Sequence, residues 1–326
     1  MLGLRRYEPA DYPSVQALHV LGLKQAGAYH GEGPWDDDLR AIEASYLTAG
    51  GDFLVGCEDG QLVAMGALRP TTRNLAEVKR MRVHPAYQGR GYGQLLLDRL
   101  EARARELGYS RLHLETSAAQ AAALSLYRKN GYREIWRAPL RGSDCFFFEK
   151  DLGEADETGE AGRVMVMRAE ECHLPGILEI YNDAVFHSTA TFDTEPKTLA
   201  DRQAWLTGHG DAYPVIVAVE DGQVLAWGSL SPFSDRPAYC YTVEDSLYVR
   251  PEVQGRGLGS RLLERLLALG VMLGYRAVLA KIVDENAPSL GVHRKFGFVD
   301  AGLLRAVGYK FGRWLDVSIL QRSFGY

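Results

Sequence analysis

Two short glycine-rich segments carry the pattern in this chain that points most directly to chemistry. Each follows an apolar stretch and leads into leucines with helical spacing; they read Gln88-Gly89-Arg90-Gly91-Tyr92-Gly93 and Gln254-Gly255-Arg256-Gly257-Leu258-Gly259. Glycine has no Cβ, so its backbone can approach a ligand closely, and the N-terminus of the following helix offers unpaired N–H groups with a partial positive charge. Each segment therefore predicts a loop that binds a pyrophosphate.

A glycine-rich loop alone has other interpretations, a dinucleotide-binding Rossmann domain or a simple tight turn. The Rossmann loop follows the first strand of its domain, with an acidic residue about 20 positions further on. Here each loop follows a late strand of the pattern described next. The Rossmann interpretation is therefore disfavoured.

A long internal repeat explains why the loop occurs twice. The tetrapeptide Glu-Asp-Gly-Gln stands at 58–61 and again at 220–223, 162 residues later, and the two glycine loops are 166 residues apart. Such agreement favours duplication of a whole domain over a small repeat unit. Residues 153–162 contain four acids, no base and no core-forming side chain. We therefore predict a first domain at 1–152, an acidic linker at 153–162 and a second domain at 163–326.

Each copy predicts the same series of elements. A strand ending in Arg6 or Arg168 precedes an amphipathic helical stretch and a hairpin that turns at Asp-Gly. A further strand runs into the glycine loop, and the stretch after the loop has one buried helical face. The ranges are 53–57, 61–68, 77–83 and 94–107 in the first copy and 215–219, 223–230, 244–249 and 260–273 in the second. This order favours an α+β fold, a mixed central sheet flanked by helices, in each copy.

Composition and charge exclude several classes of function. The chain has 326 residues, 46% of them hydrophobic, which is enough for two cores. A net charge of −5 without a basic block disfavours nucleic-acid binding. No apolar run approaches the roughly 20 residues that cross a bilayer, so we expect a cytoplasmic protein with no membrane partner. The histidines and cysteines show no metal-binding spacing, and we expect no metal.

With both loops and a later motif at 123–132 and 289–298, the chain resembles the GCN5-related N-acetyltransferases (GNAT), whose signature is a Gln/Arg-x-x-Gly-x-Gly/Ala loop. The resemblance covers both copies and implies two tandem acyl-CoA N-acyltransferase domains with acetyl-CoA as co-substrate. It implies that loop N–H groups hold the pyrophosphate of coenzyme A and that the preceding strand hydrogen-bonds the pantetheine arm. The cofactor-binding residues it points to are Met81, Arg82, Val83, Gln88, Gly89, Arg90, Gly91, Tyr92, Gly93, Leu247, Tyr248, Val249, Gln254, Gly255, Arg256, Gly257, Leu258, Gly259 and Asn286.

The second copy is more specifically similar to the phosphinothricin and methionine sulfoximine N-acetyltransferases, through residues 188–192, 242–249 and 307–316. Those enzymes acetylate the α-amine of a small amino-acid analogue. The resemblance implies that Glu244, in the Thr-Val-Glu segment, is the catalytic base.

This resemblance defines the substrate contacts less well. Phe192 is one candidate for a substrate-binding residue. Some members of the group have an arginine where this chain has Cys240, so we consider Arg236 as the residue that holds the substrate carboxylate. Three aromatic residues either line acceptor pockets or belong to the core: Trp35, Tyr46 and Trp205.

Amine acetylation requires a base, an oxyanion donor and an acid. An aliphatic ammonium titrates near pH 10, so a carboxylate such as Glu244 must remove its proton, directly or through water, before attack on the thioester. The strand before the loop supplies an N–H for the oxyanion, typically around Leu247 or Val249. A tyrosine protonates the leaving thiolate in many members of the superfamily, and Tyr127 has that place in the first copy. The second copy has His293 there, which either donates a proton or packs beside the cofactor.

The base of the first copy is less certain. Glu77 lies eleven residues before Gln88, whereas Glu244 lies ten before Gln254. Strand alternation would put the two glutamates on opposite faces. A bulge would reconcile them; alternatively, Glu77 simply begins a strand at the surface.

Other charged residues of the first copy have plain structural explanations. Arg80 and Arg82 either attract phosphates or, as is commoner, occupy the solvent-facing side of an alternating strand. The three aspartates at 36–38 fit the start of a helix, where carboxylates face the positive end of the dipole.

Three functions of different class follow from these patterns. The first is an N-acetyltransferase of small amines, such as amino acids or their analogues. The second has one catalytic copy, with the other serving as a structural or acetyl-CoA-sensing module. The third is a protein acetyltransferase acting on N-termini or lysines. The duplication is compatible with a monomer whose copies pack as a pseudo-dimer and with a homodimer.

Overall fold

The computed structural model describes residues 2–27, 29, 31, 33–140, 142–153 and 164–324. The chain divides into two compact units, a first up to Glu157 and a second from Thr158. The proposed linker at 153–162 lies outside the described residues except for Gly153. Its boundaries therefore stay a prediction.

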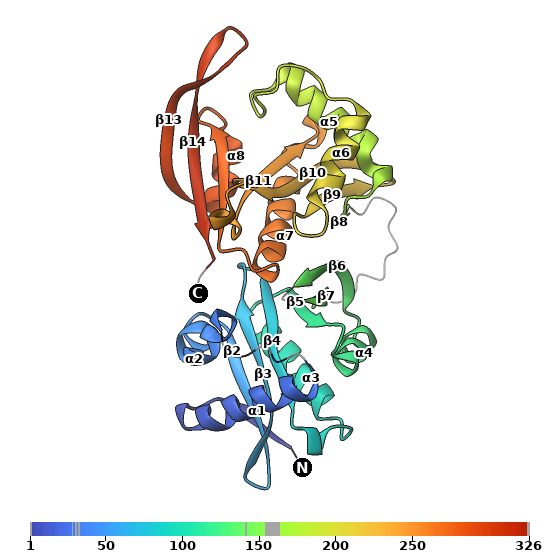
Figure 1. Ribbon diagram of the computed structural model, residues 1–326, viewed down its shortest axis with the longest axis vertical. Helices are drawn as coiled ribbons and strands as arrows, with labels where there is room; N and C mark the ends of the chain where they lie inside the picture. Colours follow the sequence, from blue (N-terminus) through green and yellow to red (C-terminus); the bar gives the residue numbers. More distant parts are fainter. Residues whose placement is uncertain are drawn as a thin grey trace. The chain divides into compact units, whose positions relative to one another are not determined.

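The first unit is built on a sheet of seven strands in the order β1, β2, β3, β4, β5, β7, β6. Of its described pairs only β4 and β5 are parallel. The sheet is flanked by helices (Figure 1). The bounds are β1 Gly3–Arg6, α1 Tyr12–Gln25, α2 Asp37–Arg40, β2 Asp52–Glu58, β3 Gln61–Pro70, β4 Leu75–Val83, α3 Tyr92–Glu106, β5 Arg111–Ser117, α4 Ala121–Lys129, β6 Arg133–Leu140 and β7 Ser143–Asp151.

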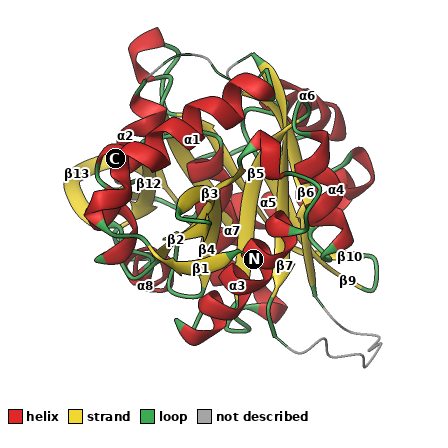
Figure 2. Ribbon diagram, turned by 90° about the horizontal axis from the view of Figure 1, so that it is seen from below, coloured by secondary structure: helices red, strands yellow, loops and turns green. Residues whose placement is uncertain are grey.

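The second unit repeats this topology, in the order β8, β9, β10, β11, β12, β14, β13. Its β11 and β12 form the matching parallel pair. The bounds are β8 Met165–Arg168, α5 Leu174–His187, α6 Leu199–His209, β9 Val215–Glu220, β10 Gln223–Pro232, β11 Thr242–Val249, α7 Leu258–Met272, β12 Ala277–Val283, α8 Ala287–Lys295, β13 Val299–Lys310 and β14 Arg313–Ser323. Strands and flanking helices are distinguished by colour in Figure 2. The predicted pair of mixed, helix-flanked sheets is confirmed.

The helices after the glycine loops supply much of each core. In α3, Leu96, Leu97 and Leu100 are completely buried, as are Leu262 and Leu266 in α7. The leucine spacing produces this result because residues three and four apart share one helical face. Each helix thereby fixes the loop at its own N-terminus against the sheet.

The parallel strands of each unit separate after three paired residues. In the first unit the pairing of β4 with β5 ends at Glu77 and His113; in the second, the pairing of β11 with β12 ends at Glu244 and Leu279. Both strands continue beyond these residues toward the glycine loop. Each unit therefore has a wedge-shaped opening in its sheet, with a glutamate at its apex.

A β-bulge lies in β4. Ala67 of β3 pairs with Lys79, but Met65, two residues earlier, pairs with Arg82, so β4 carries one extra residue here. Arg80 within the bulge has a φ of +58°, in the left-handed region. The register of β10 with β11 has no such break.

The bulge places the two glutamates at equivalent positions. Glu77 pairs with Arg69, and Glu244 pairs with Ser231. Arg69 and Ser231 are separated by the 162 residues of the repeat, so the two glutamates face the same side of their sheets. Glu77 is 4% exposed, and the alternative that it begins a strand at the surface is wrong.

The described helices include none with the length and apolarity to cross a membrane.

Candidate active sites

The glycine loops adopt the backbone that their sequence predicts. Gly89, Gly91, Gly255 and Gly257 all have positive φ values, between 77° and 82°. Gly91 and Gly257 are the N-caps of α3 and α7. The N–H groups of a helix's first turn have no partner within the helix, so each loop presents them to an anion.

The glutamine that begins each motif ties the loop to the preceding strand. The Nε2 of Gln88 donates to the carbonyl of Val83 at 3.1 Å, and that of Gln254 donates to the carbonyl of Val249 at 3.2 Å. The glutamine thus closes the turn from the end of the wedge to the helix N-terminus.

The wedge of the first unit opens into a cleft of about 780 Å³. It brings together β4, β5, the glycine loop and α4, and Trp35 lines it as well. Eight of the predicted cofactor residues line it: Met81, Arg82, Val83, Gln88, Gly89, Gly91, Tyr92 and Gly93. Arg90 is not among its lining residues and instead contacts Glu58 on the surface.

Tyr127 reaches this cleft from α4. Its side chain packs against the rings of Tyr132 and Phe148, and burial raises the pKa of Tyr127 to about 12. The phenol is therefore protonated at neutral pH.

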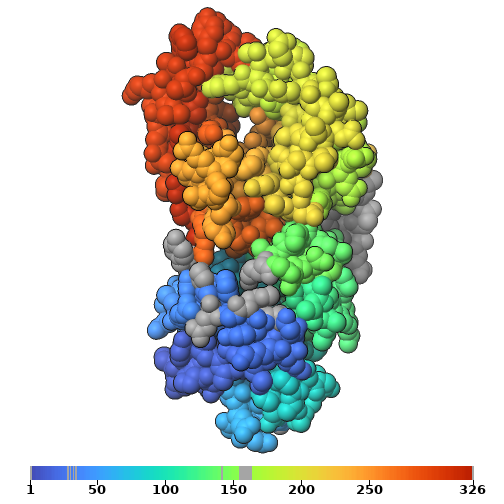
Figure 3. Space-filling model, viewed as in Figure 1, coloured from blue at the N-terminus to red at the C-terminus, as the bar shows by residue number. Residues whose placement is uncertain are grey.

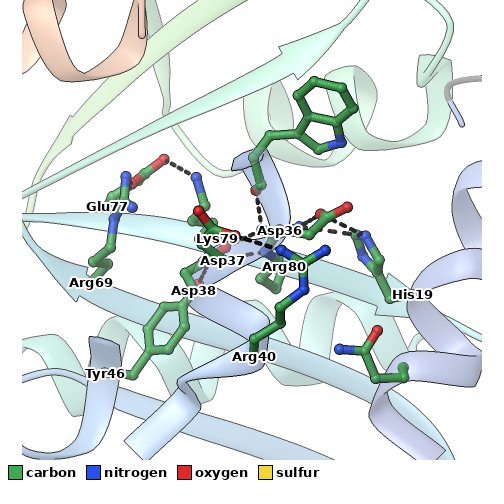
Figure 4. A network of polar contacts seen from close by, with 12 residues as sticks. His19, Asp36, Asp37, Asp38, Arg40, Tyr46, Arg69, Glu77, Lys79 and Arg80 are labelled. Atoms are coloured by element: carbon green, nitrogen blue, oxygen red, sulfur yellow. Dashed lines mark hydrogen bonds and ion pairs between the residues drawn. The ribbon is translucent and has the colours of Figure 1, made fainter. Parts of the chain in front are cut away.

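Glu77 is neutralised by two neighbouring cations (Figure 4). Its carboxylate lies 2.6 Å from Nη2 of Arg69 and 3.3 Å from Nζ of Lys79. Burial alone would raise the pKa of this carboxyl, but these two charges lower it to about 2. A carboxylate with so low a pKa is a weak general base.

Arg80 anchors the bulge in a second cluster (Figure 4). Its Nη1 lies 3.0 Å from Asp36, its Nε lies 3.0 Å from Asp38, and Nη2 donates to the carbonyl of Trp35 at 2.6 Å. Asp38 also accepts from the hydroxyl of Tyr46, which is completely buried. These bonds hold a non-glycine residue in a left-handed conformation that would otherwise be unfavourable.

This cluster bears on the expectations for Arg80 and for the aspartates at 36–38. Arg80 is 9% exposed, so its placement on a solvent-facing side is wrong. The aspartates at 36–38 do start α2, as expected, but Asp36 and Asp38 direct their carboxylates to Arg80.

Glu244 has a more open environment than Glu77. It forms an ion pair with Lys281 at 2.6 Å, and the two side chains are 26% and 44% exposed. Ser231 and Ser246 occupy the places of Arg69 and Lys79, because they hold the same register positions around the glutamate. The second unit therefore lacks the two cations that neutralise Glu77.

His293 is part of a buried pair that the sequence did not reveal. Its Nε2 lies 2.9 Å from Asp245, and its Nδ1 lies 2.7 Å from the carbonyl of Ser289. A carbonyl only accepts, so Nδ1 donates to it. Nε2 also carries a proton, which it donates to the Asp245 carboxylate. Although burial lowers the pKa of His293, its bond and attraction to Asp245 outweigh that effect and raise it.

The first unit has Val78 and Tyr127 at the positions of Asp245 and His293. The first copy therefore has an apolar residue and a phenol where the second has a buried Asp–His pair. One feature of the sequence points to this pair: Asp245 is charged, although it lies on a strand face that is otherwise apolar in both copies.

The structure brings together two segments that resemble the phosphinothricin group. Lys310 of β13 donates to the carbonyls of Ser188 and Thr191, both at 2.8 Å. Phe192 packs on Gly308, where an added Cβ would lie 2.2 Å from its ring. In Figure 3 the second unit is hollowed between this C-terminal hairpin, in red, and the yellow-green segment that follows α5.

A cavity of about 370 Å³ lies on the α5 and α6 side of β10 and β11. Trp205 and Tyr248 line it, and Tyr248 stacks on Trp227 with ring centroids 4.6 Å apart. The side chain of Tyr248, a predicted cofactor residue, therefore faces this cavity. Phe192 and Arg236 are not among its lining residues.

The remaining predicted residues have identifiable contacts. Arg236 is exposed in the loop before β11. Asn286 caps α8, its side chain accepting from the N–H of Ser289 at 3.2 Å. Arg256 pairs with Glu220 at 2.8 Å, and Leu258 is buried at the start of α7. Within the described ranges no three His, Cys, Asp or Glu side chains gather as a metal site.

A splayed parallel pair leading into a glycine loop and helix, twice in one chain, defines a tandem acyltransferase fold. The model of the acetyltransferase (GNAT) family matches residues 21–132 and 175–298. The chain therefore belongs to the GNAT family and is an acetyltransferase.

Relatives with assigned substrates match about half of the chain. The L-methionine sulfoximine/L-methionine sulfone acetyltransferase of Pseudomonas aeruginosa is 43% identical over 150 residues, which is 45% of this chain and 87% of that protein. The phosphinothricin N-acetyltransferase of Alcaligenes faecalis is 38% identical over 161 residues, 49% of this chain and 81% of that protein. The structure of yncA from Salmonella typhimurium with its cofactor acetyl-CoA matches with a TM-score of 0.50 and 34% identity, covering 50% of this chain and 95% of that one.

Proposed function

We propose that the second unit transfers the acetyl group of acetyl-CoA to the amine of a small amino acid or amino-acid analogue, and that the first unit binds acetyl-CoA without transferring its acetyl group. The observation that carries this assignment is the difference at one register position. Glu244 faces Ser231 and pairs with one exposed cation, Lys281, whereas the buried carboxylate of Glu77 faces Arg69 and is also bound by Lys79. The relatives that act on methionine sulfoximine and phosphinothricin support the substrate class.

In the proposed mechanism Glu244 removes a proton from the substrate ammonium, directly or through water. Backbone N–H groups of β11 around Leu247 and Val249, on the part of the strand that has left β12, stabilise the oxyanion. His293 is 2% exposed and both of its ring nitrogens are engaged, by Asp245 and by the carbonyl of Ser289, so we assign it to packing beside the cofactor, and the leaving thiolate takes its proton from solvent. The place of His293 corresponds to Tyr127, which lines the cleft of the first unit.

The first unit retains the features of a cofactor site. Its glycine loop, its wedge and Tyr127 line one cleft. Its glutamate, however, has a pKa of about 2 and is held by two cations. Binding of acetyl-CoA without proton abstraction is the activity that this combination supports.

The test is release of free thiol from acetyl-CoA by the full chain, with methionine sulfoximine, phosphinothricin and a panel of amino acids. We expect Glu244→Gln to lower kcat by about 10²- to 10⁴-fold, the usual contribution of a general base. The matched variant Glu77→Gln should leave kcat within about threefold of the wild type. Loss of activity in Glu77→Gln alone would move the chemistry to the first unit, and acetylation of a peptide panel in preference to amino acids would favour a protein substrate.

A further inference from the structure

The cavity of the second unit contains a buried arginine that sequence analysis did not single out. Arg202, in α6, lines the cavity and is only 5% exposed. Its guanidinium carbon lies 3.6 Å from the centroid of the Tyr181 ring and 5.1 Å from that of Trp205. Helices α5 and α6 carry these side chains and lie side by side against the sheet (Figure 1).

Arg202 forms no direct ion pair with a carboxylate among the described residues, although Asp193 and Asp201 attract its charge at longer range. Asp193, which also lines the cavity, is bound by the hydroxyl of Tyr181 at 2.7 Å and by Lys197 at 2.8 Å. Asp201 is used in the cap of α6, where it accepts from Thr198 at 2.8 Å. The Nε of Arg202 is itself buried without a hydrogen-bond partner in the described part of the chain.

A buried guanidinium without a directly bound carboxylate is unfavourable. Contact with aromatic faces offsets part of this cost, but it leaves the Nε–H of the guanidinium without an acceptor. A carboxylate would supply both a directly bound counter-charge and acceptors that match the planar fork of the guanidinium. The cavity is thus prepared for an anionic group.

The same cavity adjoins the candidate base. Ser246 lines it from β11, two residues from Glu244 and therefore on the same face of the strand. Ser231 also lines it and is the residue that pairs with Glu244 across the sheet. The cavity therefore has the buried cation of Arg202 in the wall formed by α6 and the carboxylate of Glu244 next to the wall formed by β10 and β11.

We propose that this cavity is the acceptor site of the second unit and that Arg202 binds the carboxylate of the amino-acid acceptor, with its amine directed to Glu244. The inference rests on the proposed function and assigns the substrate charge that the site requires. A molecule with an ammonium at one end and a carboxylate at the other matches both charges. Arg202 takes the role for which the sequence had indicated Arg236, which is exposed and does not line the cavity.

The test compares methionine sulfone with its carboxamide, which keeps the amine and lacks the negative charge. For Arg202→Gln we expect KM for methionine sulfone to rise roughly tenfold to hundredfold, the effect of losing a charged hydrogen bond. Its KM for the carboxamide should change less than threefold. A structural role for Arg202 would instead raise both values alike, which would overturn the proposal. Discrimination that is lost in Arg236→Gln and kept in Arg202→Gln would overturn it too.

Two further variants keep the test decisive. If Arg202→Gln does not fold, as judged by its unfolding midpoint, Arg202→Lys keeps a charge but loses the planar fork, and it should still reduce the preference for the free acid. Calorimetric binding of methionine sulfone to Glu244→Gln, with and without Arg202→Lys, measures the site without turnover. Weaker binding in the double variant supports Arg202 even if thiol release shows that Glu244 is not the base; equal binding refutes it.

Discussion

Glu77 and Glu244 occupy the same position in their two sheets, each as the last paired residue before the parallel strands separate. Their distances to the glycine loops differ by one residue, and the bulge at Arg80 absorbs the difference. The two copies can therefore be compared side chain by side chain. What differs between them is the charge around the glutamate, since Arg69 stands where the second copy has Ser231.

Removal of Arg69 should destabilise the first unit. In Arg69→Ala the buried Glu77 keeps Lys79 as an ion-pair partner, and we expect a loss of about 2 to 3 kcal/mol, somewhat less than breaking an isolated buried pair. Denaturant unfolding measures it. Arg99→Ala is the control, because its pair with Glu106 is exposed on both sides and such pairs contribute about 0.5 kcal/mol. Equal losses in both variants would contradict the buried pair.

Each glycine loop should bind one acetyl-CoA. Gly91 and Gly257 have φ values of 82° and 79°, which a β-branched residue tolerates poorly. Equilibrium dialysis should give two acetyl-CoA per wild-type chain and one for either Gly91→Val or Gly257→Val. Only Gly257→Val should abolish turnover. One acetyl-CoA per wild-type chain would show that the first cleft does not bind it.

The stability of the second unit should depend on pH through His293. Its pKa in the folded protein is raised above the ordinary 6.5, so its stabilising contribution is complete below about pH 6.5 and is lost as the pH rises through the folded value. Asp245→Asn removes this contribution, and burial then lowers the pKa of His293, which reverses the trend. The difference in unfolding free energy between wild type and Asp245→Asn, about 3 to 5 kcal/mol near pH 6, should shrink toward higher pH.

One other histidine must be separated from this effect. Burial lowers the pKa of His209 in the same unit, so His209 favours stability at higher pH in both proteins. Taking the difference between wild type and variant removes its contribution. A pH-independent difference would mean that His293 and Asp245 do not titrate as a pair.

Gly308 should be required for the contact between the C-terminal hairpin and the segment after α5. In Gly308→Ala the new Cβ would overlap the ring of Phe192, and we expect a loss of about 1 to 3 kcal/mol, typical of overpacking. Thermal unfolding of the second unit measures it. Gly302→Ala in the same strand is the control, since a Cβ there meets nothing within 4 Å. A loss in Gly302→Ala as large as that in Gly308→Ala would argue against the Phe192 contact.

Local patterns predicted the elements and the loops well. The hairpins turn at Asp-Gly in both copies, with Asp59 and Asp221 in left-handed conformations, and the leucine spacing gave the buried faces of α3 and α7. These features depend on residues close in sequence. Alternation failed at Arg80, because a bulge changes which face each residue occupies and the partners that stabilise it lie about 40 residues away.

The contacts that distinguish the two sites could not be derived in the same way. Asp245 meets His293 across 48 residues, and Glu77 meets Arg69 across a hairpin, eight residues away in the chain. Arg202 is charged and reads as a surface residue of an amphipathic helix; only the fold reveals that it is buried among aromatic rings.

The extra residue at Arg80 also limits how the two halves can exchange parts. A strand shifted by one residue turns every following side chain to the opposite face. If β4 replaced β11 in a chimaera, Arg80 would arrive without Asp36 and Asp38, which hold the bulge and lie in a segment some forty residues upstream. If the strand relaxed to regular pairing without the bulge, its glutamate would face the wrong side of the sheet relative to the glycine loop. Functional recombination between the halves therefore requires the bulge and its acidic anchor to be inherited together.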